Sequence, residues 1–277
     1  VDEMPMQKFD HHTDYEHNPW MANYVHNNAR GEATDAHHRT AFAAYLGLCE
    51  YFDRKIGKIL DTLDETGLRD NTLVIYCSDH GEMAGEHGCW WKSTYYEGSV
   101  SVPLIARLPG AVPAGARNSV LCNLLDLAPT AVEAAASTAL PAAEGHSLWT
   151  ELLGDSDGDR PDCTFSELGN SHGDPPSRMM RLGQWKLYKC HDDTPPVLYD
   201  LVKDPGELHD LGADPTHAAV RRSLLDRLYA DWDPAWVARR CAEQDKDMEV
   251  LKAWGRAVRP VHPDALPVPD VEDVTRR

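Results

Sequence analysis

The sequence predicts an α/β domain followed by a smaller α+β domain with an antiparallel sheet. A long amphipathic segment precedes a continuously apolar, β-branched run at residues 72–77, which is the order of an α/β unit. Residues 137–160 are small, acidic and rich in Gly and Pro, as expected of a domain boundary. Short runs separated by turn residues follow, and they favour a small antiparallel sheet. We therefore expect domains over residues 1–150 and 151–277.

Within the first domain, residues 36–66 are predicted to form a helix that ends at Gly67. Apolar side chains recur along it at three- and four-residue spacing, at Leu48, Phe52, Ile56, Ile59, Leu60 and Leu63. The run at residues 72–77 is predicted to be a strand buried on both faces, and residues 102–107 a second buried strand. Asp126 is expected to cap a helix that continues to about residue 136.

The second domain is predicted to contain strands over residues 163–167, 178–182, 185–189 and 197–200, with a hairpin turn at residues 182–185. A helix over residues 215–231 should pack Val220, Leu224, Leu225 and Leu228 inward. The first 35 residues read as a long polar loop, and the tail after Arg259 as an extended segment.

Composition restricts the class of protein. A formal net charge of −18, without a long Lys/Arg run, argues against a nucleic-acid partner. No apolar stretch approaches the roughly 20 residues that span a bilayer, so no membrane partner is expected. The seven cysteines form no Cys-x-x-Cys pair, and Cys49, Cys77 and Cys122 lie in apolar patterns typical of buried side chains. This usage suits a reducing compartment, and we expect a cytoplasmic location.

The polar residues that directly follow the first strand are the candidate site. Ligands bind beyond the carboxyl ends of strands in open α/β sheets, and Asp79 and His80 stand at such an end. A carboxylate and an imidazole are ready ligands for a divalent cation. They make only part of a site, because a hard cation takes about six ligands. The alternative is a turn aspartate beside a surface histidine.

Residues 77–88 read Cys-Ser-Asp-His-Gly-Glu-Met-Ala-Gly-Glu-His-Gly, followed by Trp90-Trp91-Lys92, Tyr96-Glu97 and Ser-Val-Pro-Leu-Ile at 101–105. This order and spacing closely resembles the second signature of the sulfatase family, in the alkaline phosphatase superfamily. The resemblance covers roughly residues 36–255, and residues 232–254 are similar to the choline-sulfatase and bacterial arylsulfatase branch. It implies an alkaline-phosphatase-like sandwich whose N-terminal part is missing here, followed by the small α+β subdomain.

The same resemblance implies a role for each matching residue. Asp79 and His80 match two protein ligands of the family's single divalent metal. Lys92 matches the catalytic lysine that contacts the sulfate oxygens. His87 and Glu97 are expected to position the residues that contact the metal and the substrate, or to fix the loop. The resemblance implies calcium as the first expectation for the metal. Manganese is a close second, because the imidazole of His80 is a poorer ligand for calcium than for manganese.

One part of the family pattern has no counterpart. The family nucleophile is a Cys or Ser in the motif C/S-x-P/A-S-R, with the Cys converted to formylglycine, and none of the seven cysteines stands in that context. No nucleophile is therefore expected in this chain. The first two metal aspartates are likewise expected in a missing N-terminal segment, which leaves about half of the site here.

These observations predict hydrolysis of a small-molecule sulfate ester by the intact protein. A phosphonate monoester or phosphodiester hydrolase of the same superfamily is the alternative among enzymes. An alternative from another class is a non-catalytic truncated remnant that acts as an interaction module. The tail after Arg259 could cross to a neighbouring copy, so a homo-oligomer is compatible with the sequence.

Overall fold

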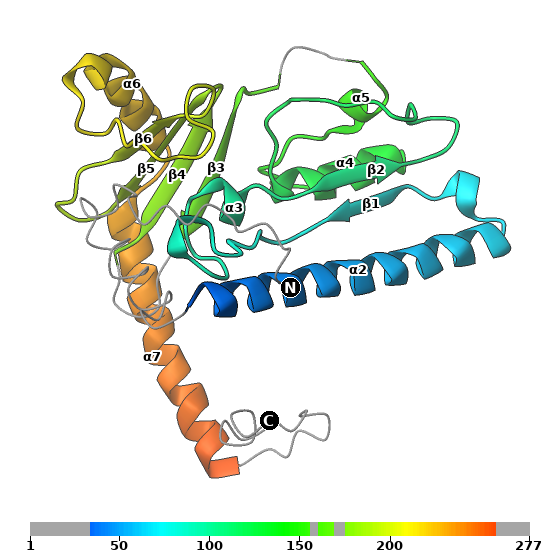
Figure 1. The fold of residues 1–277 in the computed structure, drawn as a ribbon, viewed down its shortest axis with the longest axis horizontal. Coiled ribbons are helices and arrows are strands. Elements are labelled where there is room, and N and C mark those ends of the chain that lie inside the picture. The colour runs from blue at the N-terminus through cyan, green and yellow to red at the C-terminus, as the bar shows by residue number, and fades with distance from the viewer. Residues whose placement is uncertain (1–33, 156–159, 169–174, 259–277) are drawn as a thin grey trace.

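The computed structural model describes residues 34–155, 160–168 and 175–258. A long helix lies beside a two-stranded sheet, and a four-stranded sheet stands next to them (Figure 1). The predicted N-terminal loop and the predicted extended tail lie outside the described residues.

Helix α2, Asp35–Glu65, confirms the first predicted helix. It begins at Thr34, whose hydroxyl accepts a hydrogen bond from the His37 backbone N–H at 3.3 Å. The chain leaves the helix through Gly67, whose φ of 71° suits a residue without a Cβ. The short 3-10 helix η2, Arg69–Asn71, then makes the turn into the first strand.

The apolar stripe of α2 is largely open to solvent. None of the helix residues is buried, and Phe52 and Ile59 are 52% and 56% exposed. The expectation that Cys49 is buried is wrong, because this thiol lies on the exposed side of α2. Helical periodicity shows which residues share a face, but it does not show what packs against that face.

Strands β1, Val74–Cys77, and β2, Leu104–Arg107, pair antiparallel, with Val74 opposite Arg107. The prediction of two strands is confirmed, but the prediction that they are buried on both faces is wrong. Every residue of β1 is only half-buried, and Ile105 in β2 is 61% exposed. An apolar run makes double burial favourable, yet the layers that would cover it come from elsewhere in a chain.

Along the chain between β2 and β3 come η4, Leu124–Asp126, α4, Leu127–Ala134, and α5, Trp149–Leu152. The helix predicted after Asp126 is therefore present but ends earlier than residue 136. The prediction that the Asp126 side chain caps it is wrong, because that side chain makes no capping hydrogen bond to α4. Its carboxylate turns back and accepts from the backbone N–H of Asn123 at 3.0 Å.

The second sheet confirms the four predicted strands to within one residue at each end. Its strands are β3, Cys163–Leu168, β4, Ser177–Leu182, β5, Trp185–Cys190, and β6, Val197–Asp200. They follow one another in the order β3-β4-β5-β6, with all pairs antiparallel. Gly183, at φ 55°, makes the tight turn between β4 and β5.

Both faces of this sheet are covered. On one face lie η5, Pro215–His217, and α6, Ala218–Leu228, whose Leu224 and Leu228 are buried against Met180 and Leu187. The other face packs against the loop after β1, in a cluster that comprises Met83, Cys89, Tyr95, Tyr96, Met179, Tyr188, Val197 and Tyr199. The loop that follows Asp79 and His80 is thus held by the C-terminal sheet.

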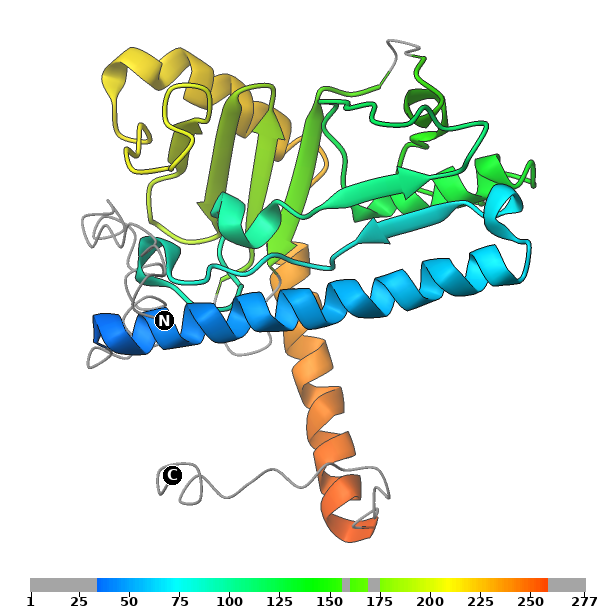
Figure 2. The same ribbon diagram turned by 45° about the vertical axis from the view of Figure 1, so that its right-hand side comes forward.

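The bounds of helix α7, Pro234–Val258, were not predicted from the sequence. The helix extends away from both sheets, in orange in Figures 1 and 2. Among the described residues, no helix combines the length and the hydropathy needed to cross a bilayer.

Candidate active site

A pocket of about 560 Å³ brings most of the predicted site residues together. Asp79 and His80 reach it from the end of β1, Lys92 from the following loop, and Glu97 from α3, Glu97–Val100. Arg181 of β4 also lines it, and the sequence had not singled out this residue. His87 is not among the lining residues.

The Asp79–His80 pair has a geometry that fits two ligands of one cation. His80 Nδ1 lies 2.8 Å from the carbonyl oxygen of Gly81, and the acceptor at this position suits a protonated Nδ1. The lone pair is then on Nε2, which is 3.5 Å from Asp79 Oδ2. Two ligand atoms about 2.2 Å from one ion, at a right angle, lie about 3.1 Å apart.

The rest of a coordination shell does not come from the part of the chain that the structure describes. Within it, no group of three or more His, Cys, Asp or Glu side chains is arranged to hold a metal ion. Asp79 and His80 therefore fit a divalent metal as two of its ligands. One oxygen and one nitrogen ligand do not separate calcium from manganese.

The loop that carries Lys92 is held by hydrogen bonds, and its backbone is strained. Glu82 Oε1 accepts hydrogen bonds from the backbone N–H groups of Ala84 and Trp91, at 3.1 and 2.6 Å. The residues on either side of Lys92 both have positive φ, 69° at Trp91 and 74° at Ser93. Such backbone strain in non-glycine residues is concentrated at functional sites, where the surrounding contacts maintain it.

Gly81 allows the chain just after Asp79 and His80 to approach helix α3 closely. Its backbone N–H donates to the carbonyl of Ser99 at 2.7 Å. A Cβ at this position would lie 2.1 Å from the Gly98 carbonyl oxygen, which no real structure tolerates. The residue after His80 therefore has to be glycine for α3 to pack this closely.

His87 stabilises the loop from its far side. Its ring stacks on Tyr96 with a centroid distance of 3.7 Å and an interplanar angle of 5°. His87 itself belongs to the short helix η3, Glu86–Gly88, and has a φ of 52°. These contacts suit a residue that shapes the loop, and its supporting role in the site stays a prediction.

Glu97 belongs to a buried network of charges. Its carboxylate lies 2.9 Å from Lys186 Nζ and 3.4 Å from an Arg181 nitrogen. Lys186 is fully buried and also pairs with Glu207 at 2.6 Å, while the Glu97 backbone N–H donates to Glu207. Burial raises the pKa of Glu207, and the Lys186 ammonium opposes this effect. The network joins the pocket to the C-terminal sheet.

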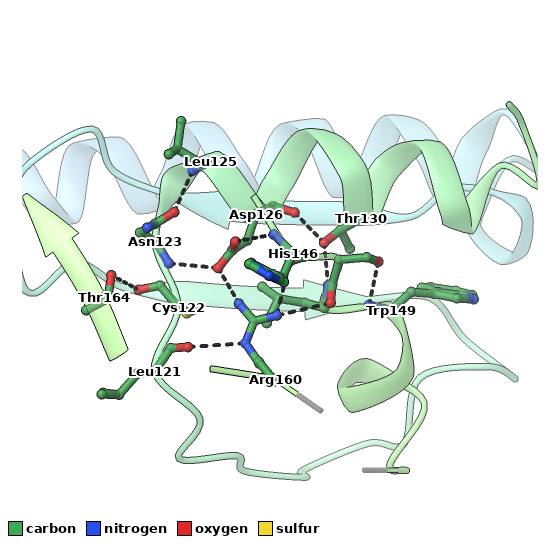
Figure 3. A network of polar contacts seen from close by, with 12 residues as sticks. Leu121, Cys122, Asn123, Leu125, Asp126, Thr130, His146, Trp149, Arg160 and Thr164 are labelled. Carbon is green, nitrogen blue, oxygen red and sulfur yellow. Dashed lines mark hydrogen bonds and ion pairs between the residues drawn. The ribbon is translucent and has the colours of Figure 1, made fainter. Parts of the chain in front are cut away.

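A second polar network surrounds Asp126 (Figure 3), and its neighbours Asn123 and Leu125 line the same pocket. The Asp126 carboxylate accepts from the backbone N–H of His146 at 2.7 Å and forms a buried ion pair with Arg160. Arg160 also donates to the carbonyls of Leu121, His146 and Ser147, at 3.2, 3.0 and 3.0 Å. The network ties three segments of the chain together.

Two protein families match the sequence. The sulfatase family matches residues 11–137. The family described as N-sulphoglucosamine sulphohydrolase, C-terminal, matches residues 85–232, which is more than half of the chain. The first match contains Asp79, His80 and Lys92, and the second contains the four-stranded sheet.

Individual relatives agree with these matches. The chain is 34% identical over 208 residues to choline-sulfatase of Rhizobium meliloti, covering 73% of this chain and 40% of that protein. It is 34% identical over 189 residues to arylsulfatase K of Gallus gallus, covering 65% of this chain and 35% of that protein. The chain thus spans less than half of the length of these curated relatives.

Among solved structures, the phosphonate monoester hydrolase of Silicibacter pomeroyi superposes with a TM-score of 0.74 and 27% identity. The superposition covers 84% of this chain and 51% of that one. This likeness confirms the alkaline-phosphatase-like fold class predicted from the sequence. The two family matches and the choline-sulfatase relative show that the chain belongs to the sulfatase family.

Proposed function

We propose that the protein carrying this chain hydrolyses a sulfate monoester of a small molecule. One observation carries the proposal: Asp79, His80 and Lys92 line the same pocket, in the order and spacing of the sulfatase signature. The names of the relatives, choline-sulfatase and arylsulfatase K, support the same reaction class.

In this proposal, Asp79 and His80 bind one divalent metal, calcium first and manganese second. When bound, such an ion polarises an oxygen of the ester and neutralises charge that develops on it. Lys92 places a fixed ammonium beside the sulfuryl oxygens, and Gly81 and the Glu82-bound loop keep that ammonium in position. Glu97 holds Arg181 at the pocket edge.

The nucleophile of the proposed reaction lies outside residues 1–277. None of the seven cysteines has the motif that precedes formylglycine formation, so the remaining catalytic groups are proposed to come from another part of the protein. Residues 1–150 and 151–277 are proposed as the catalytic part and the C-terminal subdomain.

A second candidate reaction is hydrolysis of a phosphonate monoester. The likeness to the Silicibacter pomeroyi enzyme favours it, at a TM-score of 0.74. The two reactions need the same neutralisation of charge on a tetrahedral centre, so the pocket residues described above do not separate them.

Parallel assays of the full-length protein separate the candidates. We expect kcat/KM for 4-nitrophenyl sulfate to exceed kcat/KM for the 4-nitrophenyl ester of phenylphosphonate. The reverse order would contradict the sulfatase proposal and support the phosphonate one. Absence of turnover on both esters in metal-loaded, full-length protein would instead favour the non-catalytic interaction module.

We propose that the partner is a small anionic ester, and that the protein binds neither nucleic acid nor a membrane. We also propose a cytoplasmic location. All seven cysteines lie within the described residues and none of them forms a disulfide there, which is compatible with a reducing compartment. Fractionation of cells that express the full-length protein tests this location.

A further inference from the structure

Helix α7 exposes an apolar surface that the described residues leave uncovered. Of its residues, only Pro234 at the start is buried. Large apolar side chains along the rest are about half exposed, among them Met248 at 47%, Leu251 at 56% and Val258 at 53%. Both ribbon views show the helix extending beyond the two sheets (Figures 1 and 2).

Three of the exposed apolar residues, Met248, Leu251 and Val258, share one face with the spacing of a coiled coil, whereas exposed Trp236, Val250 and Trp254 lie off that face. Alternating steps of four and three residues connect one face of the helix: Val237, Cys241, Gln244, Met248, Leu251, Gly255 and Val258. In heptad terms Cys241, Met248 and Gly255 occupy a positions, and the other four occupy d positions. The helix has 25 residues, which gives about three and a half heptads. Val237 packs on the chain's own core, so the open seam begins beyond it.

The charged residues beside this seam would meet residues of opposite charge if two copies of the helix paired. Arg240 and Asp247 occupy g positions, and Asp245 and Lys252 occupy the e positions of the heptads that follow them. In a parallel pair of helices, a g residue lies opposite the e residue of the next heptad on the partner. Two copies of α7 in register would therefore place Arg240 opposite Asp245 and Asp247 opposite Lys252.

We propose that α7 is a dimerisation helix that pairs in parallel with α7 of a second copy of this chain. Opposite charges at the e and g positions of one helix favour its parallel pairing with an identical helix. The present contacts of Arg240 with Glu243 and of Lys252 with Glu249 do not oppose this. They are exposed pairs three residues apart, which contribute little.

A matched pair of lysine substitutions tests the seam by sedimentation of the full-length protein. Leu251→Lys introduces a charge at a d position, and Ala253→Lys introduces the same charge at the outward f position. Leu251→Lys should raise the dimer dissociation constant tenfold or more, while Ala253→Lys leaves it unchanged. A monomeric parent protein, or equal behaviour of the two variants, would overturn the proposal.

A charge exchange tests the parallel register and does not rely on a single variant. Asp247→Lys alone places two lysines opposite each other, and Lys252→Asp alone places two aspartates opposite each other. Each should weaken the dimer, and the double variant should restore it, with the same helix content by circular dichroism throughout. Failure of the double variant to restore association would exclude the parallel pairing.

Cys241 supplies an independent readout, because a positions face each other across a parallel seam. Mild oxidation of a mixture of isotopically light and heavy protein should yield Cys241–Cys241 peptides that contain one light and one heavy half. Exposed Cys49 on α2 serves as the control thiol. Crosslinking of Cys49 that equals or exceeds that of Cys241 would count against the seam.

Discussion

At the scale of single residues, Glu86 has a carboxyl group that is poorly solvated. It lies in the loop that presents Lys92, and burial raises its pKa above the usual value. The folded state therefore binds this proton more tightly than the unfolded state does. Its contribution to stability is fully present below the unfolded pKa and is lost as the pH rises through the raised folded pKa.

The substitution Glu86→Gln removes this titration but keeps the shape of the side chain. We expect the variant to be more stable than the parent protein at neutral pH, and the difference to vanish in acid where both side chains are neutral. Chemical unfolding at a series of pH values measures this. A difference in stability that is constant across the series would show that Glu86 does not titrate as described.

A second prediction at the scale of single residues concerns Gly81. A Cβ there would lie 2.1 Å from a backbone oxygen, so Gly81→Ala should displace α3 and lower the activity of the full-length protein. Gly57 on α2 is the control, because a Cβ at that position meets nothing within 4 Å. Gly57→Ala should stabilise the helix by about 0.5–1 kcal/mol and leave turnover unchanged. Equal turnover in both variants would contradict the close approach of α3.

At the scale of elements, the Asp126–Arg160 ion pair connects three segments that lie between β2 and β3 along the chain (Figure 3). Arg160→Ala should cost about 3–5 kcal/mol of unfolding free energy, because it leaves a buried carboxylate without its partner. The matched control is Arg54→Ala, which removes the exposed Arg54–Glu50 pair on α2 and should cost under about 1 kcal/mol. Denaturant unfolding of both variants measures the difference, and similar costs would contradict the stabilising role of the network.

The second sheet was predicted from local signals alone. Its strands are joined by turns, and the Gly183 hairpin fixes the register of β4 against β5. The exposure of β1 was not predicted, because an apolar run indicates that a strand can be buried and does not identify its neighbours. The bounds of helix α7 were not predicted, although a helical pattern was noted around Arg239 and Arg240, because its apolar residues form no broad stripe.

Some residues of the candidate site were likewise predicted from the sequence, and others were not. Asp79, His80 and Lys92 were found because they stand near one strand end in a recognisable order. Lys186 was not assigned a role, since it is 89 positions away from Glu97 along the chain. Arg160, 34 positions from Asp126, was missed for the same reason. Contacts between distant segments depend on tertiary packing, which no local pattern encodes.

At the scale of the whole molecule, the exposed apolar surfaces of α2 and α7 belong to a chain that spans 40% of the length of choline-sulfatase. Activity and metal binding are therefore properties to measure on the full-length protein. In the proposed mechanism the described pocket supplies two metal ligands and one ammonium, and the metal ligands and the ammonium should have separable effects.

Thermal unfolding with and without excess calcium or manganese, combined with turnover of a sulfate ester, tests the central claim most directly. A bound ion at 100 times its dissociation constant stabilises the folded state by about 2.7 kcal/mol. Full-length Lys92→Ala should keep this stabilisation and lose about 10²–10³-fold in kcat. Full-length His80→Ala should lose both the stabilisation and the activity. A His80→Ala protein that is still stabilised by metal and turns over at the parent rate would remove His80 from the site and contradict the account.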